Sequence, residues 1–165
     1  ETPWDGSMLV TIPDTGFNIA GYIDRLDISG DGKRALVRDY KTGRPPKGDI
    51  RLNGGRELQR CLYAFAVKAL LGGDVAISAS LLYPREPLDL QLDDPETVLK
   101  EITGYLRAAR SSLAGGAALP GPDTGGDYDD LAFALPANAS ATYCKRKMPA
   151  ATERLGEVAQ VWEAE

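Results

Sequence analysis

The feature that most constrains this chain is a β-hairpin whose strands bring charged side chains together. Residues 21–28 alternate between apolar and polar side chains as a strand does, and residues 35–43 supply a partner strand after a Gly-rich turn. In this pairing Asp24 lies opposite Asp39, and period-2 alternation places Lys41 on the same face. The sequence therefore predicts that two acids and one cation converge at the rim of an apolar face.

The turn between the strands decides which residues face each other. Asp31-Gly32 favours a two-residue type I′ turn, in which Gly30 pairs with Lys33. A one-residue bulge would send one of the two acids to the opposite face of the pair. The convergence of the acids is therefore a hypothesis about register.

Opposed carboxylates need a compensating positive charge. Like charges directly opposite each other destabilise an antiparallel pair. A divalent cation such as Mg²⁺, which prefers carboxylate oxygens and water, would turn the repulsion into a binding site. The alternative is a solvated cluster of Asp24, Asp39 and Lys41 that holds no metal.

Three segments, in this order along the chain, resemble the motifs of one family. They are Gly21-Tyr-Ile-Asp-Arg-Leu-Asp27, Val37-Arg-Asp-Tyr-Lys-Thr-Gly43 and Glu57-Leu-Gln-Arg-Cys-Leu-Tyr63. The chain resembles the PD-(D/E)xK nuclease superfamily, and within it the RecB-like and AddB-like exonuclease domains of bacterial recombination machines. The resemblance implies an α/β fold with a restriction-endonuclease-like core, in which a mixed central β-sheet is flanked by α-helices.

The resemblance implies metal-dependent hydrolysis of DNA phosphodiesters by an exonuclease that processes broken DNA ends. Asp24, Asp39 and the backbone carbonyl of Tyr40 would hold Mg²⁺ or Mn²⁺, which activates a water. Lys41 would orient this water and stabilise charge that develops on the phosphate oxygens.

The third motif adds two catalytic candidates. Gln59 and Tyr63 are four residues apart, so they share a helix face and can contact the substrate backbone or the lysine. In this family a further acidic or histidine ligand usually comes from a helix well before the first aspartate. Only 23 residues precede Asp24 and the chain has no histidine, so we expect a fragment that lacks this helix.

Related nucleases also hold an iron-sulfur cluster with four cysteines, whereas this chain has two, Cys61 and Cys144. No partner follows Cys144 at ligand spacing, and Cys61 falls inside a predicted helix, where a small apolar residue is expected. We predict no iron-sulfur cluster.

Positive charge is concentrated around the predicted site. The net charge is −5, yet residues 33–60 hold nine of the nineteen Lys and Arg residues and only three acids. Such a patch suits a surface that follows phosphates. The residues we expect to bind DNA are Arg38, Arg44, Lys47, Arg51, Arg56 and Arg60. A second basic cluster, Lys145-Arg146-Lys147, has no assigned role.

Length and composition indicate a single domain over residues 1–165, with a core at about 8–113 and a C-terminal loop and helix at 114–165. No apolar run reaches the length of a membrane span, and two cysteines without a signal peptide favour a cytoplasmic location. The expected partners are DNA ends and a fused or associated helicase.

Hydrophobic periodicity and turn residues place the elements of this core. The expected strands cover residues 8–12, 17–28, 35–41, 75–83 and 88–92, and the first three form a meander. The expected helices cover 56–71, 94–113 with Asp94 as N-cap, and 150–163.

Two other functions compete with the nuclease. A nuclease-like domain that has lost catalysis could bind DNA or act as a scaffold inside a helicase-nuclease complex, but such copies typically lose the metal-binding acids or the lysine. A β-rich carbohydrate- or protein-binding module would leave the convergent acids and the basic loop unexplained.

Overall fold

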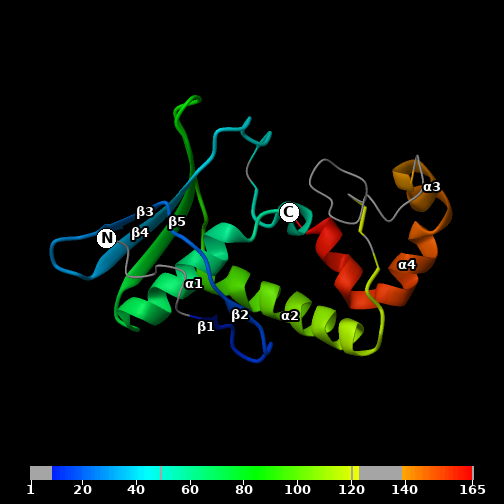
Figure 1. The fold of residues 1–165 in the computed structure, drawn as a ribbon. Coiled ribbons are helices and arrows are strands. Elements are labelled where there is room, and N and C mark those ends of the chain that lie inside the picture. Colours follow the sequence, from blue (N-terminus) through cyan, green and yellow to red (C-terminus); the bar gives the residue numbers. More distant parts are fainter. Residues whose placement is uncertain (1–8, 49, 120, 123–138, 165) are drawn as a thin grey trace.

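A mixed sheet of four strands carries the predicted site. The computed structural model describes residues 9–48, 50–119, 121–122 and 139–164. The strand order is β3-β4-β5-β6, in which β4 and β5 are parallel and the other neighbours antiparallel (Figure 1). The strands are β3 (Arg25–Ile28), β4 (Arg34–Tyr40), β5 (Ala76–Tyr83) and β6 (Leu88–Gln91). Helices flank this sheet, so the predicted α/β class is confirmed.

The register of the β3–β4 hairpin is the predicted one. Arg25 pairs with Arg38, and Ile28 pairs with Ala35. Ser29 continues the pairing, since its N–H donates to the Arg34 carbonyl at 2.9 Å. The pairing ends at Arg25–Arg38: Asp24 directly precedes β3, and its side chain accepts from the Tyr40 N–H at the end of β4.

The turn itself differs from the type I′ turn that the sequence favours. The N–H of Gly32 donates to the carbonyl of Ser29 at 2.8 Å, and only Gly32 within the loop has a positive φ, of 69°. The loop is therefore one turn followed by a left-handed glycine, and Gly30 does not pair with Lys33. Asp31 stabilises it by accepting from the Ser29 hydroxyl at 2.6 Å and the Lys33 N–H at 3.0 Å.

The first predicted strands are shorter than the alternation suggested. β1 (Val10–Thr11) and β2 (Asn18–Ile19) form a separate two-stranded sheet. The expected strand over residues 17–28 is interrupted between Ile19 and Arg25, although Ile23 in this interruption is buried in the core. The side chains between Ile19 and Arg25 keep the polarity pattern of a strand, but their backbone is not paired with another strand. The prediction of a meander is therefore wrong at this point. Met8, the first residue of the expected 8–12 strand, lies outside the described residues.

Helix α1 (Gln59–Leu71) connects the parallel strands β4 and β5 and packs on the sheet. Its small side chains Ala64, Ala66 and Val67 lie against Ala35, Val37 and Ala79 of these strands. Along β4 every second residue is buried, ending with Asp39. The last inward position of a core strand is therefore occupied by a carboxylate.

Helix α2 (Pro95–Ala114) packs against α1 through a second apolar cluster. Leu52, Cys61, Leu92, Val98 and Ile102 form its buried part. Asp94 is the N-cap, and its side chain accepts from the Thr97 N–H at 3.2 Å, as the Asp-Pro-Glu start predicts.

The C-terminal helices lie at the end of the molecule opposite to β3 and β4 (Figure 1). They are α3 (Ala139–Arg146), α4 (Met148–Leu155) and the 3₁₀ helix η3 (Gly156–Glu163). The predicted single helix over 150–163 is broken because Gly156 adopts a φ of 54°, which ends α4. The chain then returns to η1 (Asn53–Gly55), where the Gly54 N–H donates to the Ala164 carbonyl at 2.7 Å.

The contact between α1 and α2 yields a stability prediction. Ile102→Ala removes a fully buried side chain and should lower the free energy of unfolding by about 2–5 kcal/mol, measured by urea denaturation. Leu113→Ala is the matched control on the same helix, since Leu113 is 54% exposed; it should change this free energy by less than about 0.5 kcal/mol. Equal effects of the two substitutions would contradict the packing of α2.

Candidate active site

The open end of the β3–β4 hairpin holds the two predicted acids. Asp24 directly precedes β3, and Asp39 is the next-to-last residue of β4. The N–H of Tyr40 donates to Oδ2 of Asp24 at 2.8 Å, so this side chain links the end of β4 to the segment before β3. Asp24 is exposed, whereas Asp39 is only 7% exposed.

Lys41 supplies the charge that offsets Asp39. Its Nζ lies 2.6 Å from Oδ2 of Asp39. This oxygen is buried and makes no hydrogen bond of good geometry, so the contact is an ion pair that leaves acceptor capacity on the oxygen unused. The Lys41 N–H donates to the Leu82 carbonyl on β5 at 2.9 Å, which fixes the backbone at this point.

The two candidates of the third motif extend this ion pair into a chain of polar contacts. Lys41 Nζ donates to Oε1 of Gln59, the first residue of α1. Nε2 of Gln59 in turn donates to the Tyr63 hydroxyl at 3.4 Å, one helical turn away. The structure thus brings Asp39, Lys41, Gln59 and Tyr63 together, although β4 and α1 are separated by a long loop.

The surroundings of Lys41 keep it positively charged. Its partial burial would lower the pKa, but the adjacent Asp39 carboxylate and the charge of Glu57 together raise the pKa above the ordinary 10.5. A raised pKa means that these interactions stabilise the folded state below pH 10.5, and that this stabilisation is lost as the pH rises through the raised value. At neutral pH Lys41 therefore acts as a cation and not as a base.

Two residues of this site were not assigned a role by the sequence. Glu57 is 7% exposed, and Tyr83, the last residue of β5, is 6% exposed. Burial raises the pKa of Tyr83, and the negative charge of Glu57 raises it further. Glu57 lies within the third motif, but an acid just before a helix is typical of a helix cap, so its sequence position did not indicate an active-site role. Glu57 does act as a cap, since its side chain accepts from the Arg60 N–H at 3.1 Å.

The donor set at the end of the hairpin suits a hard divalent cation. Asp24 and Asp39 are carboxylates, and the buried Oδ2 of Asp39 has acceptor capacity to spare. Among the residues that the structure describes, no group of three or more His, Cys, Asp or Glu side chains gathers in a way that could hold a metal. The buried Glu57 does not join Asp24 and Asp39 in such a group, and it is engaged by Arg60 instead.

The family model of the PD-(D/E)XK nuclease superfamily matches residues 3–162. The chain belongs to this superfamily. No curated protein and no solved structure matches the chain. Membership indicates a nuclease that acts on DNA with divalent metal ions, so the resemblance seen in the sequence is confirmed at the level of the superfamily.

The basic residues around the site of this superfamily member differ in their exposure. Arg44, Lys47 and Arg56 are exposed on the loop between β4 and α1 and its end. Arg51 on the same loop is exposed and pairs with Glu101 at 3.0 Å. Arg38 points to the opposite side of β4 from Asp39, where it pairs with Asp27 and lies 3.8 Å from Asp89.

Arg60 departs from the expectation that it contacts DNA. It is 2% exposed, and its guanidinium donates to four backbone carbonyls. These belong to Ile50 and Arg51 in the loop and to Leu90 and Gln91 in β6, at 2.7–3.3 Å. A guanidinium enclosed in this way cannot reach a phosphate, and it instead ties the loop to the sheet and to α1.

Cys61, in contrast, has the structural role that the sequence predicts. It is 2% exposed on α1, and burial raises the pKa of its thiol to about 12. The Cys61 thiol is therefore neutral at physiological pH. The side chain of Cys144 lies outside the described residues.

The enclosure of Arg60 can be tested by stability. Arg60→Met should lower the free energy of unfolding by about 3–5 kcal/mol, because it leaves the buried Glu57 carboxylate, 3.8 Å from Arg60 Nε, without its cation. Urea denaturation followed by circular dichroism measures the change. Arg44→Met, on the exposed part of the same loop, is the control, with an expected change of less than about 0.5 kcal/mol. Equal midpoints for the two variants would mean that Arg60 does not anchor the loop.

Proposed function

We propose that this chain is the exonuclease domain of a RecB-like or AddB-like protein that processes broken DNA ends. The observation that carries the proposal is the set of contacts from Asp39 through Lys41 to Gln59 and Tyr63. Each of these residues stands at a motif position of the resemblance, and the motifs occur in the expected order.

In this proposal the metal ligands are Asp24, Asp39 and the carbonyl of Tyr40. Mg²⁺ or Mn²⁺, when bound there, polarises the scissile phosphate and lowers the pKa of a bound water. The Tyr40 N–H donates to Asp24, and this bond holds the backbone of Tyr40 in place. Asp39 and Tyr40, which are adjacent in β4, are therefore positioned together.

Lys41 places its ammonium between the carboxylate of Asp39 and the incoming phosphate. As a permanent cation it stabilises the negative charge that develops on the phosphate oxygens and orients the attacking water. Gln59 is a positioning residue, because it accepts from Nζ and limits the directions in which Lys41 can point. Tyr63 positions Gln59 in the same way.

The substrate in this proposal is a DNA end. The exposed cations Arg44, Lys47, Arg51 and Arg56 follow β4 directly and lie between it and α1, where a phosphodiester backbone entering the site would pass. A fused or associated helicase that delivers the strand, and action in the cytoplasm, belong to the same proposal. No described helix has the length and apolar character that a membrane span needs.

One observation favours a second candidate, an inactive nuclease-like domain that binds DNA or acts as a scaffold. Among the described residues no group of three His, Cys, Asp or Glu side chains could hold a metal, whereas a catalytic site of this superfamily usually has a further acidic or histidine ligand beside the two aspartates. Against this candidate, Asp24, Asp39 and Lys41 are all present: Asp24 accepts from the Tyr40 N–H, and Asp39 pairs with Lys41, which reaches Gln59.

Cleavage assays separate the two candidates. The full-length protein that carries this chain should degrade end-labelled single- or double-stranded DNA with Mg²⁺ or Mn²⁺. Lys41→Ala should lower the rate by about 10²–10³-fold, because a charged donor at the reacting phosphate is lost. Gln59→Ala should lower it by about 10–100-fold, as expected of a positioning residue.

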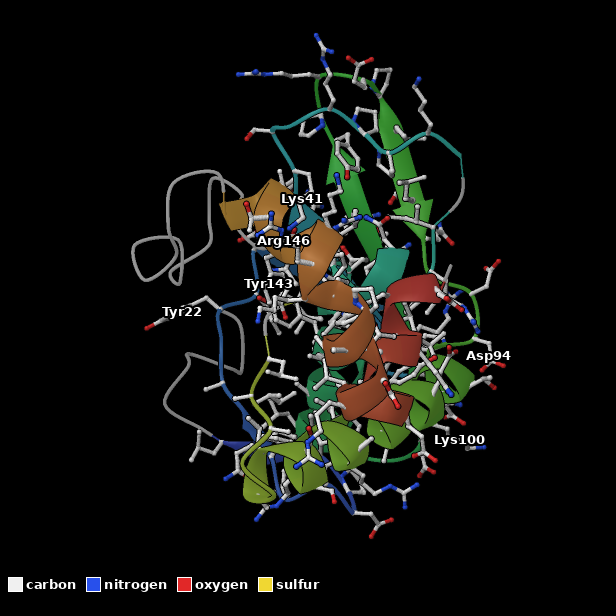
Figure 2. All side chains as sticks on the ribbon, turned by 90° about the vertical axis from the view of Figure 1, so that its right-hand side faces the viewer. Tyr22, Lys41, Asp94, Lys100, Tyr143 and Arg146 are labelled. Atoms are coloured by element: carbon white, nitrogen blue, oxygen red, sulfur yellow. The ribbon has the colours of Figure 1, made fainter. Side chains whose placement is uncertain are left out.

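Lys100→Ala is the matched control for these variants. Lys100 is an exposed cation on α2, and Figure 2 places it on the side away from Lys41. The cleavage rate of the Lys100→Ala variant should equal that of the unmodified protein. Cleavage that persists unchanged in Lys41→Ala would overturn the mechanism, and DNA binding without any cleavage would favour the scaffold.

A further inference from the structure

The junction of α3 and α4 carries a second basic surface that the proposed active site does not use. Lys145, Arg146 and Lys147 follow one another here, and all three are exposed. These three residues are called the α3–α4 patch below.

This patch has no acidic counterpart in the part of the chain that the structure describes. None of the three cations forms an ion pair with a described residue, and Glu153 is the only acid between residues 139 and 155. The chain as a whole is acidic, with a net charge of −5. Adjacent exposed cations create a local positive field that attracts a polyanion.

Helix stability does not account for the patch. Lys145 and Arg146 lie in the last turn of α3, where the helix dipole favours a cation. Lys147, however, is the N-cap of α4, where the dipole disfavours one and where Ser, Thr, Asp or Asn is preferred. Three adjacent cations also repel one another, and a bound anion would relieve this repulsion.

Figure 1 places the C-terminal helices and the β3–β4 hairpin at opposite ends of the molecule. In Figure 2, which looks along that direction, Lys41 and Arg146 both lie in the upper half of the view, whereas Lys100 lies at the lower right. The α3–α4 patch and Lys41 are therefore at a similar height but toward different ends. A DNA strand that contacts both has to extend along the length of the molecule.

We propose that the α3–α4 patch binds the phosphodiester backbone of the DNA strand whose end lies in the active site. This inference rests on the proposed function, because DNA is the polyanion that a nuclease active site binds. A lipid surface fits less well, because the exposed neighbours Ala141, Thr142 and Ala150 are small or polar and offer no large apolar side chain to insert. The patch adds affinity and holds the strand, and it takes no part in bond cleavage.

Salt-dependent binding tests this inference without requiring cleavage. A fluorescein-labelled single-stranded oligonucleotide is titrated in EDTA with the protein and with the variant Lys145→Gln, Arg146→Gln, Lys147→Gln, and anisotropy is followed at several salt concentrations. Each phosphate contact contributes about 0.7 to the slope of log K against log salt on a single strand, so the slope should fall by about 2. The cleavage rate at saturating DNA should stay unchanged.

Two further variants make the result specific. The charge-conserving variant Lys145→Arg, Arg146→Lys, Lys147→Arg should retain the slope, because phosphate contacts need charge and not one particular side chain. Lys100→Gln removes an exposed cation outside the patch and should leave the slope unchanged. Melting curves followed by circular dichroism confirm that all variants are folded.

The outcomes separate this inference from the proposed function. If the unmodified protein cleaves DNA and the triple Gln variant keeps both slope and affinity, the inference is overturned and the function stands. An equal loss in Lys100→Gln would also overturn it, because net charge alone would then explain binding. If the protein neither binds nor cleaves DNA, the proposed function is wrong, and the inference about the α3–α4 patch is overturned with it.

Discussion

The register between β3 and β4 is the constraint on which the site depends. Because β4 alternates into the core, its last inward position is Asp39, and the pairing with β3 brings Asp24, one residue before Arg25, to the same end of the hairpin. A buried carboxylate needs a compensating charge, and Lys41 provides it from the residue that follows β4. A slip of one residue would break the bond between Asp24 and the Tyr40 N–H. The strand pairing therefore decides which side chains meet at this end of the hairpin.

A second set of interactions keeps α1 in place against this hairpin. Gln59 can reach Lys41 only if the start of α1 lies beside the end of β4, although a long loop connects the two elements. Arg60, the next residue, holds this start by bonding to loop and β6 carbonyls. Gln59, which contacts Lys41, and Arg60, which anchors the loop, are therefore neighbours in the first turn of α1.

Sequence patterns predicted the parts of the structure that local chemistry decides. The register predicted from the Asp31-Gly32 turn is the one observed from Arg25 to Ile28, and Asp94-Pro95 predicted the start of α2. The turn type was wrong because the hairpin closes with one turn and a left-handed Gly32, which keeps the same register as the expected turn. The meander was wrong because polarity alternates between Ile19 and Arg25 without strand pairing. Arg60 could not be recognised as buried, since its four partners are backbone carbonyls from distant segments, which no local pattern reveals.

The central claim is that Asp24 and Asp39 form one metal site, and calorimetry tests it most directly. Mn²⁺ or Mg²⁺ is titrated into this chain and into the double variant Asp24→Asn, Asp39→Asn, which keeps the shape of both side chains and removes their charge. We predict measurable binding to the unmodified chain and none to the double variant. Equal binding to both would place the metal elsewhere, and binding to neither would contradict a metal site built from these two residues.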